Sequence, residues 1–433
     1  MEVRNYMNTH EFDAIIVGTG PGGATVAREL SKKKKKVLML ERGSDPTIKG
    51  TYLQAASMFM PGKGTLFTYG GLAMVRGITM GGSSIFYYAT AFPPPVAMLK
   101  KYGIDITKEI EECKKELPIA PLKDELIGPM AHRIMQSARE LGYPWDKLPK
   151  FVFQDKCRAN CDKCNLGCPY GAKFNARMWA EEAVTMGASL IVNAKVERVL
   201  FDGRRAVGVE FIKKGKKEKA YANDIIIAAG GIGSPIILRN SGLKGAGFDY
   251  FFDPLICVMG TVKDVKGGRE FPMATGHQFV EDGYVMTDMT IPQLLYQAFT
   301  AEVLRFDRLF SHSRTLQIMI KEKDSLGGYL TNKEGVRKRL AFDDKKKLMH
   351  GYERAKNILK NAGAKHIYKS WYIAAHPGGT VKIGHLLDKN LQTEKEHLYV
   401  CDCSVIPEAW GLPPAFTLYS LGKRLAKHLI KSK

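Results

Sequence analysis

The glycine-rich turn GTGPGG, residues 18–23, constrains the fold of this 433-residue chain more than any other feature. The apolar run FDAIIVG leads into it, a helix-type sequence follows, and a second apolar run ends at Glu41. Gly18 permits a tight turn, Gly20 lets a pyrophosphate approach the backbone, and Gly23 lets helix and strand pack closely. Glu41 stands where an acid accepts hydrogen bonds from a ribose. The pattern predicts a strand–turn–helix–strand unit that binds a dinucleotide, with the diphosphate at the helix N-terminus.

Three later apolar runs predict further strands. They read LIVNAKVERVL, AVGVEF and DIIIAAGGIGSP, and charged turns separate them. The last run ends in small residues around Gly230, which suits a close approach to the same nucleotide. Between about residues 246 and 374 the pattern is mixed and shows no repeat, so we expect a separate domain there that faces the substrate.

Five segments, in this order, resemble the glucose–methanol–choline (GMC) oxidoreductases, flavoproteins that oxidise alcohols with FAD. They touch both ends and the middle of the chain: GTGPGG with Glu41, TMGGSS (79–84), AAGGIGSPIILRNSG (228–242), HPGGTVKIG (376–384) and VCDCSVIPEAWGLPPAFTLYSLGKRLA (400–426). The resemblance implies an α/β fold in which a discontinuous, Rossmann-like FAD-binding domain joins a second α+β domain for the substrate. It also implies an FAD-dependent dehydrogenase or oxidoreductase that acts on the CH–OH group of donors.

The resemblance assigns FAD-binding roles to residues beyond the first turn. Gly81, Gly82 and Ser83 would pack along the flavin and the diphosphate, and Gly230 belongs to the second family signature. Asp402 would hydrogen-bond the ribityl or diphosphate region. The helix that begins near Pro414 would direct its positive end at the flavin and stabilise the reduced, anionic form.

The same resemblance places His376 over the flavin, as the base that takes the alcohol proton while hydride passes to the flavin. Imidazole suits this role because its ordinary pKa of about 6.5 lies near operating pH. Family members carry a second His or Asn beside this residue, but the segment GLPPAFT places Pro413 there. Proline has no side-chain donor or acceptor. Tyr87 and Tyr88 are candidates to supply the missing hydrogen bond.

Four of the eight cysteines lie within twelve positions, in the segment CRANCDKCNLGCP. Cys157, Cys161, Cys164 and Cys168 have the spacing C-x3-C-x2-C-x3-C, and a proline follows. This spacing favours a 4Fe–4S cluster held by thiolates. A structural zinc site remains the alternative, and unliganded thiols or disulfides are a third interpretation. The segment also resembles the cysteine-bearing part of the sterol-oxidase and long-chain-alcohol branch of the family, so we expect a metal-binding insertion beside the flavin domain.

We therefore predict five consecutive parts. They are a first part of the FAD-binding domain (10–100), an insertion with the four-cysteine loop (101–180), a second FAD-binding part (181–245), a substrate-binding domain (246–374) and a third FAD-binding part with His376 (375–433).

The charge of the chain favours anionic partners. Its 65 Lys and Arg against 44 Asp and Glu give a net charge of +21, which suits an acidic electron-carrier protein or redox subunit. A lysine-rich surface that only promotes solubility is the alternative. No RNA-recognition, zinc-finger or helix-turn-helix signature is present, so we expect no nucleic acid partner.

Hydropathy bears on location. No apolar run approaches the roughly 20 residues of a membrane span, so we expect no transmembrane segment, although peripheral membrane contact stays open. The first ten residues are polar and do not resemble a signal peptide, which favours the cytoplasm. Thiols stay reduced in that compartment, where clustered cysteines more often bind metal than form disulfides.

Three functions fit these features. The first is oxidation of a hydrophobic alcohol, with electrons passed through the iron–sulfur cluster to a partner. The second uses the same cofactors in a reductase or desaturase of carbon–carbon bonds in an isoprenoid-like substrate, because Pro413 removes a polar catalytic group. The third is a non-enzymatic electron-transfer subunit, which the intact HPGGT segment argues against, because a relay needs no base.

Overall fold

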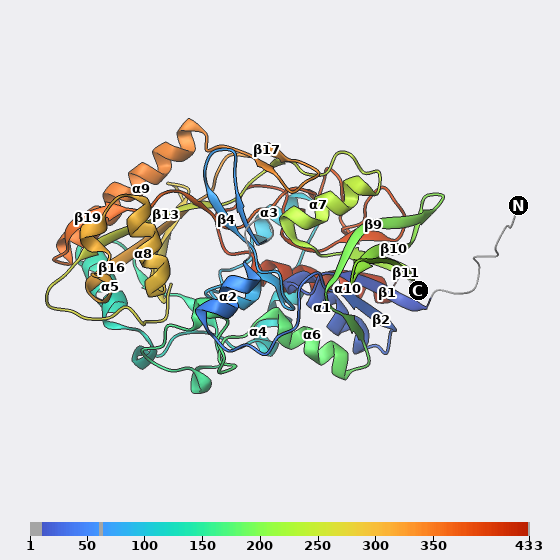
Figure 1. Cartoon of the computed structure of the whole chain (residues 1–433), viewed down its shortest axis with the longest axis horizontal. Helices are drawn as coiled ribbons and strands as arrows, with labels where there is room; N and C mark the ends of the chain where they lie inside the picture. The colour runs from blue at the N-terminus through green and yellow to red at the C-terminus, as the bar shows by residue number, and fades with distance from the viewer. Residues whose placement is uncertain (1–10, 60–63, 432–433) are drawn as a thin grey trace, which may run out of the picture.

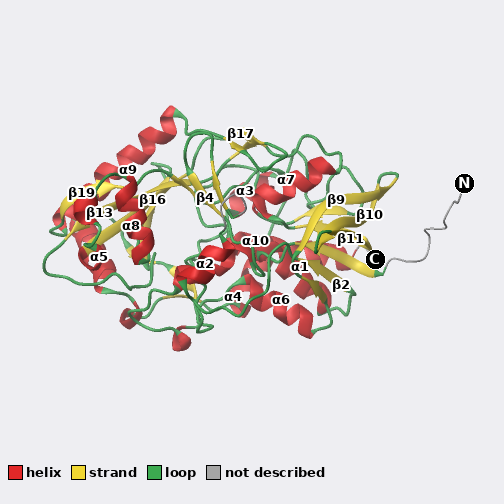
Figure 2. Ribbon diagram, viewed as in Figure 1, coloured by secondary structure: helices red, strands yellow, loops and turns green. Residues whose placement is uncertain are grey.

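The computed structural model describes residues 11–59 and 64–431. The molecule is elongated, with one β-sheet toward each end of its long axis and helices packed on both sheets (Figure 1, Figure 2). The first sheet lies at the end of the molecule that holds β1 (Phe12–Val17), the first described strand. The second lies at the far end, beneath the longest helix, α9 (Phe342–Asn361).

The first sheet has seven strands in the order β8-β2-β1-β11-β10-β9, and β21 also pairs with β11. The strands β8, β2, β1, β11 and β21 run parallel, as buried apolar runs of an α/β sheet do. The other two pairings, β9–β10 and β10–β11, are antiparallel. The strands are β1 (Phe12–Val17), β2 (Val37–Leu40), β8 (Ser189–Ile191), β9 (Ala194–Asp202), β10 (Arg205–Lys213), β11 (Lys216–Ile227) and β21 (Leu398–Val400).

The predicted elements of this sheet are confirmed. The run FDAIIVG forms β1, the run ending at Glu41 forms β2, and the helix between them is α1 (Pro21–Ser31). The three later apolar runs form the strands from β8 to β11. Continuous apolar runs and glycine-rich turns were therefore enough to predict most of the strands of this sheet from the sequence.

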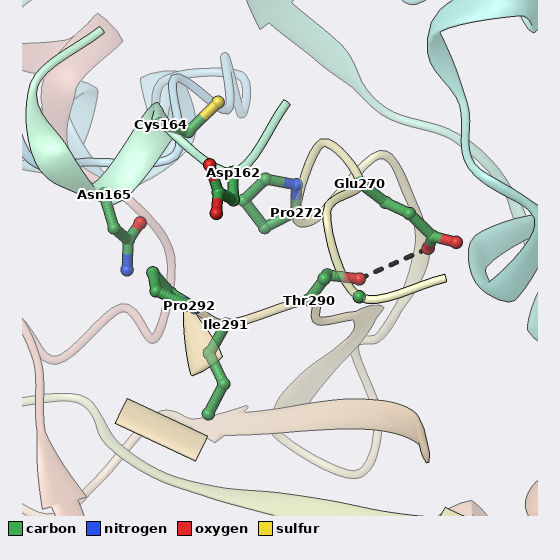
Figure 3. Close-up of a pocket in the computed structure, with 9 residues that line it drawn as sticks. Asp162, Cys164, Asn165, Glu270, Pro272, Thr290, Ile291 and Pro292 are labelled. Carbon is green, nitrogen blue, oxygen red and sulfur yellow. Dashed lines mark hydrogen bonds between the residues drawn. The ribbon is translucent and has the colours of Figure 1, made fainter. Parts of the chain in front are cut away.

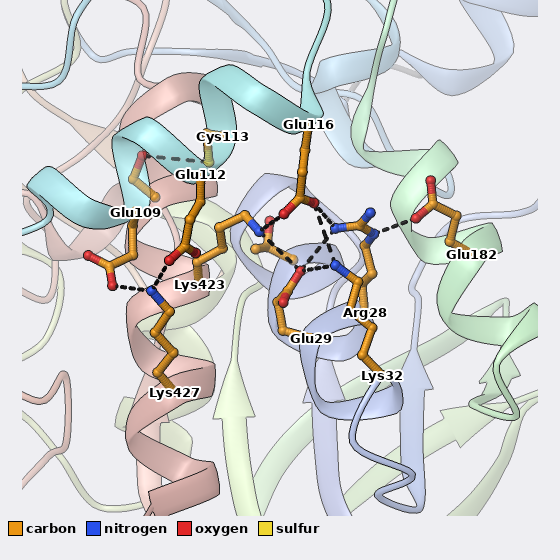
Figure 4. A network of polar contacts seen from close by, with 12 residues as sticks. Arg28, Glu29, Lys32, Glu109, Glu112, Cys113, Glu116, Glu182, Lys423 and Lys427 are labelled. Carbon is orange, nitrogen blue, oxygen red and sulfur yellow. Dashed lines mark hydrogen bonds and ion pairs between the residues drawn. The ribbon is translucent and has the colours of Figure 1, made fainter.

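Helices pack beside this sheet, and ion pairs link them to one another. The helix α1 packs against α6 (Ala176–Thr185) and α10 (Ala415–Lys431), and α10 also packs against α4 (Thr107–Glu116). Figure 4 shows the polar network that links them. The buried Lys423 donates to Glu116 at 2.6 Å and to Glu29 at 3.2 Å, and Arg28 pairs with Glu116. These contacts fix α10 against the other helices.

The second sheet has nine strands in the order β3-β4-β20-β13-β16-β15-β14-β6, and β19 also pairs with β13. They are β3 (Thr65–Phe67), β4 (Ala73–Val75), β6 (Asp146–Lys147), β13 (Pro254–Thr261), β14 (Thr275–Phe279), β15 (Tyr284–Asp288), β16 (Thr315–Glu322), β19 (Lys365–Lys369) and β20 (Ile373–Ala374). The sequence predicted a separate domain here but none of these strands. Three of the strands, β3, β4 and β6, come from segments before residue 150.

The two faces of the second sheet bury different residues, because alternate strand residues point to opposite faces. Ile256 and Val258 pack with α9 and α5 (Pro129–Glu140). Cys257 and Met259 belong to another apolar cluster, which includes Tyr296 of α8 (Gln293–Glu302) and is contacted by Tyr88. This second face is therefore the one in contact with the segment that follows the TMGGSS motif.

The remaining elements are short or isolated. They are α2 (Tyr52–Met58), α3 (Val96–Lys101), α7 (Gly230–Asn240), β5 (Ile119–Pro121), β7 (Pro149–Phe151), β12 (Phe248–Tyr250), β17 (Gly327–Leu330), β18 (Val336–Arg337), and the 3-10 turns η1 (Gly82–Ile85), η2 (Asp124–Leu126), η3 (Gln154–Lys156), η4 (Cys164–Leu166), η5 (Phe306–Arg308), η6 (His312–Arg314) and η7 (Cys403–Val405). Within the described parts of the chain, no helix has the length and apolar character needed to cross a membrane. The division into five parts stays a prediction.

Candidate active site and cysteine loop

The glycine turn between β1 and α1 has one open side. Gly18 has a φ of 101°, and a Cβ on it would meet the carbonyl oxygen of Ala228 at 2.3 Å. A Cβ on Gly23 would lie 2.1 Å from the carbonyl oxygen of Gly18, so glycine is needed for packing at both positions. A Cβ on Gly20, by contrast, would meet no atom within 4 Å. The open side of the turn therefore lies over Gly20, at the N-terminus of α1.

Glu41 holds the glycine turn by hydrogen bonds. It is buried, and its Oε2 accepts hydrogen bonds from the backbone N–H of Thr19 at 3.0 Å and from the Thr19 hydroxyl at 2.7 Å. Its Oε1 accepts from the N–H of Gly43 at 2.8 Å. Burial raises the pKa of Glu41, and these hydrogen bonds oppose the rise. A carboxylate accepts about four hydrogen bonds, so this set leaves room for a ribose hydroxyl.

The second glycine motif lies against the first. The N–H of Gly81 donates to the Thr19 hydroxyl at 2.9 Å, and a Cβ on Gly82 would lie 3.4 Å from Gly20 Cα. Ser83 Oγ accepts from the N–H of Gly77 at 3.1 Å. The structure thus brings together segments that are about sixty residues apart in the chain.

Gly230 and Asp402 also meet. The N–H of Gly230 donates to Asp402 Oδ2 at 2.8 Å, and Ser234 donates to the same oxygen. Asp402 Oδ1 accepts from the N–H of Ser404 at 2.8 Å. Asp402 therefore joins the start of α7 to η7, and no atom lies within 4 Å of a Cβ built on Gly230. The helix α10 begins directly after Pro414, as predicted.

These segments fit FAD. Two glycines, Gly20 and Gly230, have open space where a side chain would stand, and Gly20 at the N-cap of α1 leaves the first helical N–H groups without a side-chain cap. Such N–H groups attract a diphosphate. The residues that would hold FAD in this arrangement are those of the two glycine turns, Glu41 and the start of α7.

His376 lies against a buried ion pair that the sequence did not predict. Lys321 Nζ stands 3.0 Å from His376 Nδ1 and 3.1 Å from Asp253 Oδ2. Asp253 Oδ2 lies 3.4 Å from the same Nδ1. The side chains of Lys321 and Asp253 are 2% and 1% exposed, whereas that of His376 is 30% exposed. The His376 ring therefore turns its Nδ1 edge to a buried lysine and a buried aspartate.

The charges of this group act on one another. Burial favours the neutral form of Asp253, but Lys321 and His376 outweigh it and lower the pKa of Asp253. Burial lowers the pKa of Lys321, and Asp253 opposes this. Burial and the neighbouring ammonium of Lys321 both lower the pKa of His376, so its neutral form is favoured.

A second lysine–aspartate pair supports the first. Asp324 accepts from the N–H of Asp253 at 3.0 Å, and Lys338 Nζ lies 2.8 Å from Asp324. The side chains of Lys338 and Asp324 are 3% and 0% exposed. This second pair holds the backbone that carries Asp253 and does not contact His376 in the described hydrogen bonds.

The two tyrosines proposed as substitutes for Pro413 are engaged elsewhere. The Tyr87 hydroxyl donates to the carbonyl of Phe174 at 2.6 Å, and the Tyr88 hydroxyl accepts from the side-chain amide of Asn165. The Tyr88 hydroxyl therefore holds the cysteine segment at Asn165, and the Tyr87 hydroxyl holds Phe174, which follows that segment in the chain. The sequence did not point to Lys321: a charged pair, KE, stands at the end of the apolar run TLQIMI, but nothing ties it to His376.

The four cysteines of residues 157–168 line one hollow, together with Arg158, Tyr170, Lys173 and Phe271. All four are free thiols. Within residues 11–59 and 64–431, no three His, Cys, Asp or Glu side chains are arranged to hold a metal ion. Burial raises the pKa of Cys164 to about 12 and that of Cys157 to about 11, so these thiols are neutral at pH 7 in this arrangement.

Lys173 fastens this loop to the second glycine motif. Its ammonium is buried and donates to the carbonyls of Ile85 at 2.7 Å, Tyr87 at 2.9 Å and Cys164 at 2.5 Å. Its backbone N–H donates to the sulfur of Cys168 at 3.4 Å. Since Ile85 ends η1, the cysteine loop packs directly behind the TMGGSS motif.

A second hollow is also lined by Cys164 (Figure 3). Asp162, Asn165, Glu270 and Thr290 contribute polar groups to its lining. Burial raises the pKa of Glu270 to about 7, and the Thr290 hydroxyl donates to its carboxylate at 3.3 Å. Cys164 is shared by both hollows, and so it joins the cysteine loop to residues 268–272 and 290–292.

Comparison with known proteins assigns the family. Two family models described as GMC oxidoreductase match residues 12–247 and 317–422. An uncharacterized protein of Methanocaldococcus jannaschii is 28% identical over 423 residues, which cover 97% of this chain and 100% of that protein. A long-chain-alcohol oxidase of Arabidopsis thaliana is 25% identical over 517 residues, which cover 98% of this chain and 68% of that protein.

The fold agrees with a solved structure. Pyridoxine 4-oxidase from Mesorbium loti superposes with a TM-score of 0.75 at 16% identity, over 96% of this chain and 99% of that one. The chain therefore belongs to the GMC oxidoreductase family, and it is an FAD-dependent oxidoreductase that acts on the CH–OH group of its donors.

Proposed function

We propose that this enzyme oxidises a hydrophobic alcohol with His376 as the base, and that the four cysteines of residues 157–168 hold a 4Fe–4S cluster through which electrons leave for an acidic redox protein. The observation that carries the proposal is the hollow lined by all four thiols, directly behind the TMGGSS motif. A redox centre in that place lies close to the segment that packs along FAD.

The spacing of the cysteines supports a cluster over zinc. The segment C-x3-C-x2-C-x3-C followed by a proline ends as ferredoxin cluster loops do. A structural zinc ion would instead draw its four thiolates to about 2.3 Å from one centre. A 4Fe–4S cluster carries one thiolate on each of its four irons, so its ligands stand farther apart. When bound, such a cluster supplies a one-electron acceptor and donor.

His376 is suited to take the hydroxyl proton of the donor. The described contacts of Lys321 and Asp253 with His376 are made at Nδ1, and Nε2 lies on the other side of the ring. Burial and the Lys321 cation lower the pKa of His376, which keeps the imidazole neutral, as a base must be. FAD, when bound, supplies the acceptor for the hydride.

A buried apolar cluster beside His376 supports a hydrophobic donor. Met259 and Met319 of the second sheet belong to a cluster that Ala375, Trp410 and Tyr88 contact. Ala375 precedes His376 and Tyr88 lies behind the TMGGSS motif, so this cluster adjoins both parts of the site. The long-chain-alcohol oxidase among the relatives supports the same class of donor.

The partner surface follows from the cysteine loop. Lys156 and Arg158 beside Cys157 are exposed, and the chain carries a net charge of +21. An acidic carrier protein is the electron acceptor that complements such a surface.

The decisive experiment is anaerobic purification followed by measurement of iron, acid-labile sulfide, zinc and FAD. We expect FAD together with about four irons and four sulfides per chain. The variant Cys161→Ser is expected to lose iron and sulfide, whereas Cys113→Ala, which removes a buried thiol of α4, retains both. Zinc without sulfide, or iron unaffected by Cys161→Ser, contradicts the cluster.

Anaerobic addition of long-chain alcohols tests the chemistry. Bleaching of the flavin absorbance by alcohols, followed by reduction of the cluster, is the expected result. If reduced enzyme is instead reoxidised by isoprenoid double bonds and not by aldehydes, the enzyme is the reductase or desaturase. If no alcohol reduces the flavin while a redox protein exchanges electrons rapidly, the chain is an electron-transfer subunit.

A further inference from the structure

The contact between Lys321 and His376 constrains where the histidine carries its proton. Lys321 Nζ lies 3.0 Å from His376 Nδ1, a hydrogen-bond distance. An ammonium has donors only and no acceptor. As long as Lys321 is charged, Nδ1 must therefore offer its lone pair, and the proton of a neutral His376 must stand on Nε2.

A base that acts at Nε2 needs the opposite tautomer. Its Nε2 must be free of a proton, and Nδ1–H must then donate to something. Two acceptors face Nδ1: Asp253 Oδ2 at 3.4 Å, and Lys321 Nζ once that amine has lost a proton. The shorter contact is the one to Lys321, and Asp253 already accepts from Lys321 at 3.1 Å.

We propose that Lys321 is the positioning residue that sets the tautomer of His376, and that it receives the Nδ1 proton when His376 Nε2 takes the proton of the donor. This rests on the proposed role of His376 as the base. Lys321 thereby performs the orienting task for which Pro413 has no polar group.

The step balances as follows. The donor CH–OH becomes C=O; its hydride goes to FAD, and its hydroxyl proton goes to His376 Nε2. The proton on Nδ1 moves to the neutral amine of Lys321. The histidine ends neutral with its proton on Nε2, and the lysine ends as an ammonium paired with Asp253. Release of the Nε2 proton to solvent, with return of a proton from Lys321 to Nδ1, restores the starting state.

The surroundings of Lys321 suit a group that gains and loses a proton. Four titratable groups face it: Asp253 and His376 in direct contact, and Asp324 and Cys403 farther away. Asp324 is paired with Lys338, so Asp253 is the anion left to balance Lys321. Burial disfavours the ammonium while Asp253 favours it, which places the two forms of Lys321 closer in free energy than in water.

The test is the protonation of the imidazole nitrogens, read by 15N NMR of histidine-labelled holoenzyme over a range of pH. His376→Asn identifies the signal among the ten histidines. We expect Nε2–H at pH 7 and conversion to Nδ1–H at higher pH, as Lys321 loses its proton. A wild-type His376 that carries Nδ1–H at pH 7 overturns the proposal without any variant.

Lys321→Met supplies the second measurement. Without the ammonium, Nδ1–H is expected to donate to Asp253, so the tautomer switches at pH 7. The pKa of His376 should rise by about one unit or more, because a neighbouring cation is gone and the anion remains. The matched control is Lys338→Met, which breaks the other buried lysine–aspartate pair and should leave the His376 tautomer unchanged. An unchanged tautomer in Lys321→Met, or an equal change in both variants, contradicts the proposal.

The NMR test of Lys321 and the activity test of His376 as the base can fail independently of each other. The NMR signal reports the Lys321–His376 contact without any donor. If His376→Asn reduces its flavin with alcohol as fast as the wild type, His376 is not the base, whatever its tautomer. If His376→Asn is inactive but Lys321→Met keeps the wild-type pH profile of flavin reduction, His376 is the base and the proposed role of Lys321 is wrong.

Discussion

At the scale of single residues, the glycines of the first turn differ in what surrounds them. A Cβ on Gly23 would collide with the carbonyl of Gly18 at 2.1 Å, whereas a Cβ on Gly20 would meet nothing. We therefore expect Gly23→Ala to lower the thermal stability of the protein whether or not FAD is bound. Gly20→Ala should fold normally but bind FAD at least about tenfold more weakly, because the methyl group occupies the approach of the diphosphate. Melting temperatures and FAD titrations of both variants check this. If Gly20→Ala binds FAD as tightly as the wild type does, the diphosphate does not approach the backbone at Gly20.

His376 is the second residue with a specific expectation. His376→Gln should slow flavin reduction by the donor about 10²- to 10⁴-fold, the usual contribution of a general base. FAD content and the flavin spectrum should not change, because no hydrogen bond to the glycine turns is lost. Stopped-flow absorbance under anaerobic conditions measures the rate. A loss of FAD together with activity would assign His376 to cofactor binding instead.

The sequence predicted the role of single residues well where one short motif contains all the residues that the role needs. The glycines at 18, 20 and 23 lie within one turn, and the structure shows each in the expected strand–turn–helix setting. Lys321 and Asp253 could not be predicted, because they reach His376 from two other segments of the chain, 55 and more residues away. A charged residue at the end of a strand carries no local sign of its partner.

At the scale of elements, the helix network of Figure 4 responds to acid. Glu116 of α4 accepts from Lys423 and Arg28, which more than offset its burial and lower its pKa to about 2 from an ordinary 4.5. The native state keeps Glu116 ionised below pH 4.5, where the unfolded chain binds a proton, so this part of the stability is lost as pH falls from about 4.5 toward 2. We expect the free energy of unfolding of Glu116→Gln to depend less on pH over that interval. Urea unfolding at several pH values measures it, with Glu111→Gln as the exposed control; equal slopes for wild type and Glu116→Gln contradict the prediction.

The elements themselves were predicted unequally. Parallel strands buried on both faces are continuous apolar runs, which the sequence shows directly, so β1, β2 and β11 were predictable. The second sheet takes β3, β4 and β6 from the first 150 residues and β20 from residues 373–374. Strands of two or three residues contain too few positions to show an alternation, and their pairing depends on contacts that only the folded chain makes.

At the scale of the whole molecule, the net charge of +21 makes a prediction about rate. An acidic one-electron carrier should be reduced more slowly as salt increases, because ions screen attraction beyond about 8 Å at physiological strength. Reduction of a neutral quinone should hardly change. Steady-state rates with both acceptors between low and high salt measure the difference. A parallel salt dependence for both acceptors contradicts electrostatic docking.

The ammonium of Lys173 binds the carbonyl of Cys164 and those of Ile85 and Tyr87, and so one cation belongs to two sites at once. Thermodynamic linkage follows: whatever orders the cysteine loop also orders the TMGGSS motif, and each ligand lowers the entropic cost of receiving the other. If the loop holds the cluster proposed above, insertion of the cluster and of FAD is one cooperative event in place of two independent ones. Cells starved of iron should then accumulate a chain that is also short of FAD.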